Sequence, residues 1–97
     1  MNIVRPERLE EFARKHADSR KSIAAWSYDV GKAIWVSKQD VLNDFPKAKM
    51  IANNRARFEI VHNTYRLIIK IYYDLRTVEI RFIGTHNEYE RINPETI

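Results

Sequence analysis

Two side chains near the C-terminal end of the sequence, His86 and Tyr89, have the chemistry and spacing of a proton-transfer site. Residues three positions apart lie on the same side of a helical turn, so both rings would face one way if Asn87 opened such a turn. A histidine changes charge near neutral pH, which suits it to proton transfer. A lone histidine at the end of a strand is more often structural, so the spacing leaves both roles open.

A hairpin is expected to position basic side chains near these residues. Residues 65–73 and 77–85 are rich in β-branched and aromatic side chains and are separated by a short turn. They should therefore form neighbouring antiparallel strands. Alternation along each strand places Arg66, Lys70 and Arg81 on the same face of the sheet.

The register of this hairpin would bring like charges together. A tight turn places Lys70 opposite Arg81, and Tyr72 opposite Glu79. Two like charges facing each other are unfavourable unless an anion lies over them. Basic groups beside tyrosines can grip phosphates while a base stacks on a ring, so the pattern favours nucleic-acid binding. A solvated face on which basic residues pair with acids such as Glu79 is the alternative.

The charge distribution points the same way. The chain has 17 Lys and Arg against 13 Asp and Glu, a net charge of +4. Residues 47–81 hold eight of the basic residues and three acids, which is +5, so the rest of the chain carries −1. A concentrated positive field favours a polyanion such as RNA or DNA, although a merely basic surface would look alike. The basic residues of this stretch are Lys47, Lys49, Arg55, Arg57, Arg66, Lys70, Arg76 and Arg81.

The elements that must position these residues are helical in the first half of the chain and extended in the second. A first helix begins near Pro6, a second is capped by Asp18 or Ser19, and a short third helix is capped by Ser37. Residues 58–61 predict a strand before the hairpin. The predicted fold class is α+β, with N-terminal helices packed on one face of a small, mainly antiparallel sheet, in a single domain of residues 1–97. The apolar positions expected to face the core are Leu9, Phe12, Ile23, Trp26, Val30, Ala33, Ile34, Val41, Leu42, Phe45, Tyr65, Leu67, Ile69, Ile71, Tyr73, Val78, Ile80 and Phe82.

Several classes of protein are excluded by what the sequence lacks. There is no cysteine, so disulfides, thiolate zinc sites and cysteine nucleophiles cannot occur. The three histidines have no metal-ligand spacing, and no P-loop, dinucleotide-binding or HExxH motif is present. No metal or other cofactor is therefore expected. No apolar run could span a bilayer and the first residues do not form a signal peptide, so a cytoplasmic protein without membrane contact is expected.

Two segments of the hairpin and its C-terminal extension resemble the HigB-type toxins of the RelE superfamily. The similarity extends over nearly the whole chain, but the opening of the hairpin departs from the family pattern. Family members often have a Gly-Asn turn where this chain has Val61-His62-Asn63-Thr64, and Glu59 is acidic in a basic region. The segments that carry the resemblance are YRLIIKIYY at 65–73 and IRFIGTHNEYE at 80–90.

The resemblance implies a RelE-like fold and the toxin of a type II toxin–antitoxin pair. Such a toxin is a metal-independent endoribonuclease, an mRNA interferase, that cuts mRNA usually on the ribosome. Its partner would be a HigA-type helix-turn-helix antitoxin, and operator DNA would be bound only through the complex. A non-catalytic module that inhibits translation by occupying RNA or the ribosome stays open, as does a purely structural interaction domain.

Cleavage of this kind requires proton transfer and stabilisation of charge on the phosphate. His86 is the candidate for proton transfer, Arg66 for charge stabilisation, and Tyr89 for stacking on a base or assisting with a proton. The candidate RNA-binding residues are Lys70, Arg81, Arg57 and Tyr72.

Overall fold

The protein, seen here as a computed structural model that describes all 97 residues, is built on a five-stranded sheet. The strand order is β1-β5-β4-β3-β2, with β1 parallel to β5 and every other neighbouring pair antiparallel. The predicted α+β class with a mainly antiparallel sheet is confirmed. The strands are β1 (Asn2–Val4), β2 (Lys49–Ile51), β3 (Arg55–Ile60), β4 (Tyr65–Tyr72) and β5 (Thr77–Thr85).

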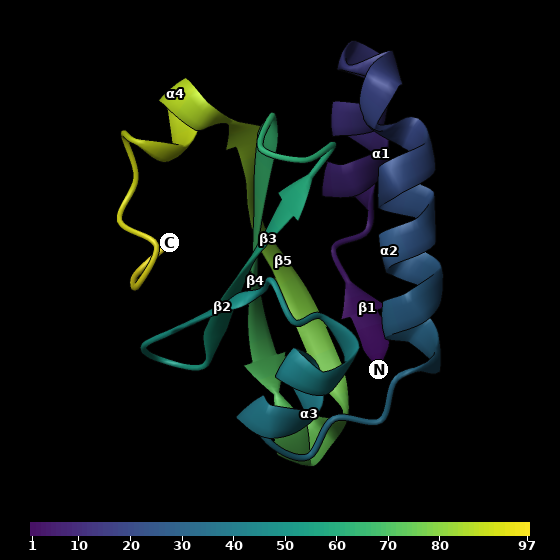
Figure 1. The fold of residues 1–97 in the computed structure, drawn as a ribbon, viewed down its shortest axis with the longest axis vertical. Helices are drawn as coiled ribbons and strands as arrows, with labels where there is room; N and C mark the ends of the chain where they lie inside the picture. The colour runs from purple at the N-terminus through teal and green to yellow at the C-terminus, as the bar shows by residue number, and fades with distance from the viewer.

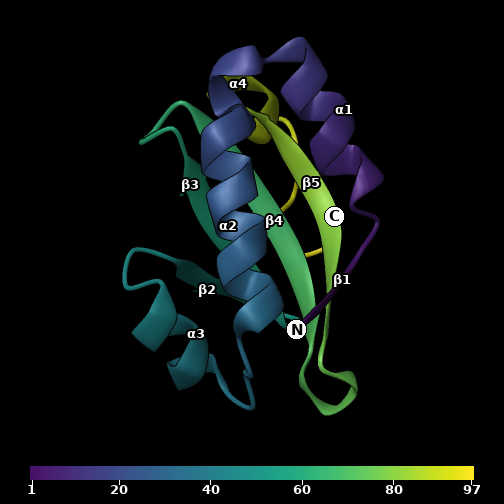
Figure 2. The same cartoon turned by 90° about the vertical axis from the view of Figure 1, so that its right-hand side faces the viewer.

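Helices α1 (Glu7–Lys15) and α2 (Arg20–Lys32) cover one face of this sheet (Figures 1 and 2). A 3₁₀ turn, η1 (Ala17–Ser19), joins them, and the short α3 (Lys38–Asp44) lies beside the β2 end of the sheet. The apolar stripes of α1 and α2 are buried as their spacing predicted. The expectation that Ile34 faces the core is wrong, because α2 ends at Lys32 and the extended backbone at Ala33 leaves Ile34 66% exposed.

The core lies between these helices and the sheet. Leu67, Ile69 and Ile71 of β4 project into it and are almost fully buried, as their alternation predicted. Trp35 follows α2 and is 1% exposed, and its indole Nε1 donates a hydrogen bond to Asp44 at 2.9 Å. This bond satisfies the one polar atom of the largest fully buried side chain.

Two short strands and part of a third were not predicted. β1 and β2 have three residues each, which is too short for a period of two to show. β1 pairs with β5, more than seventy residues away in the sequence, through Ile3 opposite Val78. β3 begins at Arg55, three residues before the expected start.

The predicted register of the β4–β5 hairpin is wrong. The connection is longer than a tight turn, because η2 (Tyr73–Leu75) and a left-handed Arg76 separate the strands. Lys70 therefore lies opposite Glu79 rather than Arg81, and Tyr72 lies opposite Thr77.

A β-bulge in β5 corrects a second expectation. Ile69 pairs with Ile80, whereas Ile68 pairs with Phe82, so Arg81 is the extra residue of the bulge. The bulge reverses the alternation beyond it. Ile83 packs against the core instead of Phe82, and Phe82 lies on the opposite face, where its ring is 6.3 Å from that of Tyr89.

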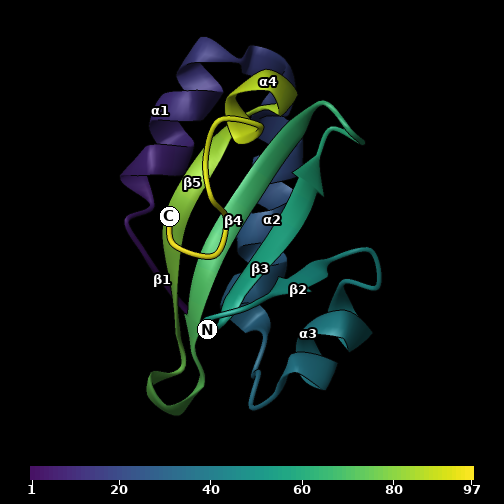
Figure 3. The same cartoon turned by 90° about the vertical axis from the view of Figure 1, so that its left-hand side faces the viewer.

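The face of the sheet opposite α1 and α2 carries α4 (His86–Tyr89) and the C-terminal segment, residues 90–97 (Figures 1 and 3). Thr85 begins α4 with a capping box, in which its hydroxyl accepts from the Glu88 amide and its own amide donates to the Glu88 carboxylate at 2.8 Å. The helix thus starts one residue earlier than the expected Asn87. None of the helices has both the length and the apolar character needed to cross a membrane.

Candidate RNA-binding and active site

Five cationic side chains share the face of the sheet under α4, and we refer to them as the basic face. The strand register places Arg55 beside Lys70, and Arg57 beside Ile68. Arg66 lies next along β4, beside Glu59 of β3, and Arg81 projects from the bulge of β5. Glu59 and Glu79 are the acids in register on these three strands, so the charge of the face is strongly positive. The basic face consists of Arg55, Arg57, Arg66, Lys70 and Arg81.

Tyr89 lies over two of these arginines. The guanidinium carbons of Arg57 and Arg66 are 5.6 and 5.9 Å from the centre of its ring, within the range of a cation–π contact. Arg57 Nη1 also donates to the Tyr89 hydroxyl at 3.4 Å. The Nε atoms of both arginines are buried and have no hydrogen-bond partner. A ring that can stack and two guanidinium groups with free donors therefore meet at one place.

Arg66 is held from the turn between β3 and β4. Its Nη1 donates to the main-chain oxygen of Asn63 at 3.2 Å and to the Asn63 side chain at 3.3 Å, and lies 3.9 Å from the Glu59 carboxylate. The turn is strained, because Val61 and His62 have φ of 54° and 55°, a region that glycine occupies without strain. This chain therefore differs from the Gly-Asn turn of the family at residues whose backbone must be left-handed.

Gly84 lets α4 approach the sheet closely. A Cβ atom at this position would lie 2.6 Å from Cζ of Phe82 and 3.0 Å from the Glu88 carboxylate oxygen. Any side chain here would displace the Phe82 ring or break the capping box. Because Tyr89 belongs to α4 and its ring lies 6.3 Å from that of Phe82, such a shift would disturb the position of Tyr89 over the arginines.

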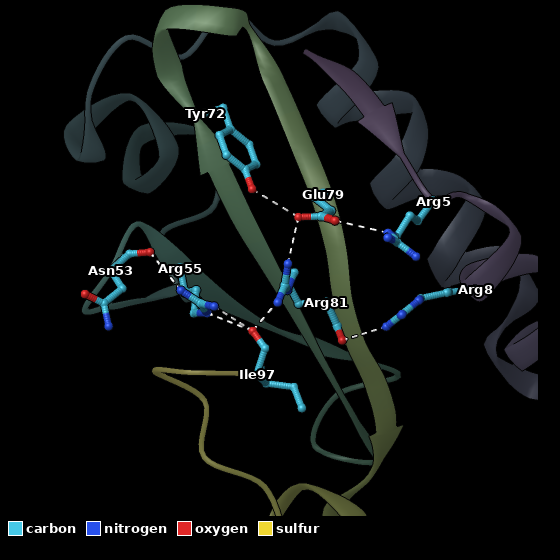
Figure 4. Close-up of polar contacts among 8 residues, drawn as sticks. All are labelled: Arg5, Arg8, Asn53, Arg55, Tyr72, Glu79, Arg81 and Ile97. Atoms are coloured by element: carbon cyan, nitrogen blue, oxygen red, sulfur yellow. Dashed lines mark hydrogen bonds and ion pairs between the residues drawn. The ribbon is translucent and has the colours of Figure 1, made fainter.

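Glu79 organises the other half of the basic face (Figure 4). Its carboxylate accepts from Arg81 Nη1 at 2.9 Å, from the Tyr72 hydroxyl at 3.2 Å and from Arg5 Nε at 3.0 Å. The Arg81 hydrogen bond, with those of Tyr72 and Arg5, holds the pKa of the Glu79 carboxyl below its usual value, although partial burial opposes the shift. Lys70 lies alongside, with Nζ 5.2 Å from the centre of the Tyr72 ring.

The lowered pKa of Glu79 makes the contribution of this network depend on pH. A carboxyl whose pKa is lower in the folded state stabilises the fold above its unfolded pKa and loses that contribution as the pH falls through its folded pKa. We expect Glu79→Gln to cost about 1 kcal/mol at pH 7, and the cost to shrink as the pH falls below about 4.5. Thermal unfolding of both proteins between pH 7 and pH 3 measures this.

The control for this comparison is Glu10→Gln, which removes one carboxylate from the exposed surface of α1. It should change stability by less than about 0.5 kcal/mol. A Glu79→Gln deficit that stays constant or grows on acidification would contradict the assignment of the stabilising contacts to ionised Glu79.

The structure does not bring His86 together with the arginines. Its side chain is 54% exposed at the start of α4, and its ring Nδ1 lies 3.7 Å from the Glu90 carboxylate. Of the predicted site residues, Arg57, Arg66 and Tyr89 form one cluster, whereas Lys70, Tyr72 and Arg81 surround Glu79. His86 lies at the solvent edge of α4.

Arg55 is the site residue that the sequence interpretation missed. It is 6% exposed, and its side chain bonds the main chain of Asn53 and of Ile97. Its charge was counted in the basic stretch, but the strand was expected to begin at Phe58. Continuing the alternation back from Glu59 through Arg57 would have placed Arg55 on the same face.

The largest cavity lies elsewhere and suits another kind of ligand. It has a volume of about 630 Å³ between α2, the loop after α3 and the end of β3. Its lining is apolar around Trp26 and Phe58 and includes the carboxylates of Asp29, Asp44 and Glu59. Lys47 is the one Lys or Arg of the lining against these three carboxylates, so the cavity is net negative while the basic face is net positive, and we place the candidate site on the basic face. No group of three or more His, Asp or Glu side chains is arranged to hold a metal ion.

Comparison with known proteins identifies the family of this chain. A family model described as HigB_toxin, the RelE-like toxic component of a toxin–antitoxin system, matches residues 19–92. The matched region begins at the end of η1 and includes both the basic face and α4. A search of curated proteins found no match. The family match covers most of the chain, and the protein therefore belongs to the HigB family of RelE-like toxins, the toxic components of toxin–antitoxin systems.

Proposed function

We propose that this toxin is a metal-independent endoribonuclease that cleaves mRNA, with the basic face as its RNA-binding surface and Arg57, Arg66 and Tyr89 at its centre. The observation that carries the proposal is the pair of buried Nε donors of Arg57 and Arg66 without acceptors beneath the Tyr89 ring. Buried charged donors are costly unless they are paired. A phosphate between the two guanidinium groups would supply acceptors, while the adjacent base stacks on Tyr89.

The reaction that fits these groups is attack by a ribose 2′-oxygen on the neighbouring phosphate. The 2′-hydroxyl loses its proton, the bond from its oxygen to phosphorus forms, and the bond from phosphorus to the 5′-oxygen breaks. The leaving 5′-oxygen takes up a proton. Arg66 and Arg57 stabilise the negative charge that builds up on the phosphate.

We assign the proton transfers to α4. The Tyr89 hydroxyl already contacts Arg57, and His86 is three residues before it in the same helix. The His86 side chain is 54% exposed and its one ion-pair contact, 3.7 Å from the exposed Glu90 carboxylate, is weak enough for the ring to turn toward bound RNA. Proton-transfer groups typically contribute about 10²–10⁴-fold to a rate.

The partners follow from the family and from the charge of the basic face. A toxin of a toxin–antitoxin system has an antitoxin partner. We propose that this antitoxin is of the HigA-type helix-turn-helix class and that operator DNA is bound only through the complex. The ribosome would present mRNA to the basic face, in the cytoplasm.

The experiment is cleavage of a defined RNA by the purified toxin in excess EDTA, followed by mapping of the fragment ends. The mechanism predicts 2′,3′-cyclic phosphate and 5′-hydroxyl ends, and no cut where the attacking 2′-hydroxyl is replaced by hydrogen. His86→Ala and Tyr89→Phe should each slow cleavage about 100-fold with little loss of binding. Cleavage that requires an added metal ion, or that leaves 5′-phosphate ends, would overturn the mechanism.

A second candidate is a non-catalytic module that inhibits translation by occupancy. The exposed position of His86, away from the arginines, favours it, because the cluster then contains binding groups but only Tyr89 as a proton donor. Growth arrest on induction without mapped mRNA cuts would select this module over the nuclease. RNA that the purified toxin leaves uncut both with and without ribosomes would do the same.

A further inference from the structure

The C-terminal segment ends on two arginines of the basic face. Arg55 donates to the main-chain oxygen of Ile97 through Nε at 3.0 Å and through Nη2 at 2.7 Å. Arg81 donates to the same oxygen through Nε at 3.0 Å (Figure 4). Three guanidinium donors therefore converge on a single oxygen atom. One oxygen atom has only two lone pairs to offer these three donors, whereas the paired N–H groups of an arginine fit the several oxygens of a phosphate.

Both arginines are oriented by neighbours that do not belong to the C-terminal segment. Arg55 is 6% exposed, and its Nη1 donates to the main-chain oxygen of Asn53 at 3.1 Å. Arg81 is anchored by its ion pair with Glu79 at 2.9 Å. We refer to Arg55 and Arg81 as the fork. It would keep its shape if the C-terminal segment left, which a binding site for a separate ligand requires.

The charge at this place exceeds what the segment supplies. Lys70 lies beside Arg55 in the sheet register, so three cations gather here, and Glu79 is ion-paired with Arg81. The C-terminal segment places a single oxygen atom against Arg55 and Arg81. A phosphate would bring negative charge as well as additional acceptors.

The segment is attached by few contacts. Apart from the turn bonds within the segment and to α4, it has four hydrogen bonds to the rest of the chain. Three run from Arg55 and Arg81 to the Ile97 main-chain oxygen, and one runs from Asn53 Nδ2 to the Glu95 main-chain oxygen at 3.0 Å. Asn93, Glu95 and Thr96 are exposed. A segment with few buried contacts opens at low cost in free energy.

We propose that Arg55 and Arg81 form a phosphate-binding subsite for RNA, and that residues 93–97 occupy it as a strap that RNA must displace. The strap lies over β4 and β5 on the same face as α4, the helix that carries Tyr89 (Figure 3). An RNA strand centred on the Arg57–Arg66–Tyr89 cluster would place a neighbouring phosphate at the fork. This inference rests on the proposed function, since it takes RNA as the ligand.

The test compares the full chain with a chain ending at Ile92. The probe is a single-stranded RNA oligonucleotide with 2′-O-methyl groups throughout, which cannot be cleaved. The shortened chain should bind it about tenfold more tightly, and the dependence of the affinity on salt should steepen by about 0.7 for each additional phosphate contacted. Arg55→Gln should remove this gain, so that truncation at Ile92 no longer raises the affinity of the variant.

The control is Arg20→Gln, which removes the same charge from α2 on the opposite face. It should leave the gain intact. Circular dichroism on each chain shows whether the protein without the strap is folded, and Asn53→Gly provides a second way to loosen the strap. Glycine keeps the left-handed backbone at this position, where φ is 63°, but removes the donor to Glu95. We expect it to raise affinity about fivefold, the effect of one hydrogen bond.

The outcomes separate this inference from the function on which it rests. RNA binding of equal affinity and equal salt dependence in the full chain, the shortened chain and Asn53→Gly would overturn the strap while leaving the proposed function standing. No RNA binding by any of the folded proteins would overturn the proposed function itself.

Discussion

Replacing Arg66 with glutamine should lower the rate of RNA cleavage by about 10²–10³-fold. Arg66 is 8% exposed, faces the Tyr89 ring and has a buried Nε donor without an acceptor, so its charge is in place to stabilise the phosphate as it becomes more negative. The measurement is single-turnover cleavage of a defined RNA with enzyme in excess, which separates the chemical step from binding.

Two controls make this result interpretable. Arg20→Gln removes a positive charge from the helical face and should leave the rate within about twofold, because exposed charges at a distance are screened. Thermal unfolding must show that Arg66→Gln is folded, since the loss of the contacts with Glu59 and Asn63 has its own small cost. A folded Arg66→Gln protein that cleaves at the wild-type rate would remove Arg66 from the site.

Replacing Trp35 with alanine should destabilise the protein by about 3–5 kcal/mol. Trp35 is 1% exposed, packs edge-on against Phe45 at 6.1 Å between ring centres, and donates to Asp44. A domain of this size has about 5–15 kcal/mol of stability in total, so the variant should be close to unfolding at 37 °C. Urea unfolding followed by circular dichroism gives the free energy and the midpoint.

Neighbouring variants separate packing from the hydrogen bond. Trp35→Phe keeps most of the ring but loses the donor to Asp44, and should cost about half as much as Trp35→Ala. Val36→Ala, at a side chain that is 69% exposed, should change stability by less than about 0.5 kcal/mol. A free energy of unfolding for Trp35→Ala within 1 kcal/mol of the wild type would mean that the core does not depend on this ring.

The candidate site was predicted in its composition more than in its arrangement. The alternation of β4 placed Arg66 and Lys70 on the polar face because one strand has a regular period of two. The pairing between strands was wrong, because it depends on the length of the η2 connection and on the bulge at Arg81, and neither has a signature in the residues themselves. The same bulge moved Phe82 out of the core and beside Tyr89.

The sequence by itself determined the class of the fold, the helices that bury Phe12, Trp26 and Val30, the central hairpin and the family. These features rest on local periodicity and on a C-terminal motif, each of which is contained in a short stretch of the chain. Counting Lys, Arg, Asp and Glu along the chain also located the basic stretch, since this count depends only on the sequence.

Only the tertiary structure decided which of the basic residues meet. Arg57 and Arg66 come together under Tyr89 because β3, β4 and α4 converge. Arg55 and Arg81 reach the same oxygen of Ile97 because β3, β4 and β5 are neighbours in the sheet and the bulge turns Arg81 to this face. These contacts join residues 16 to 42 positions apart, and they depend on register, bulges and the path of the chain. Their free energies come from the folded arrangement as a whole, so no local pattern of residues encodes them.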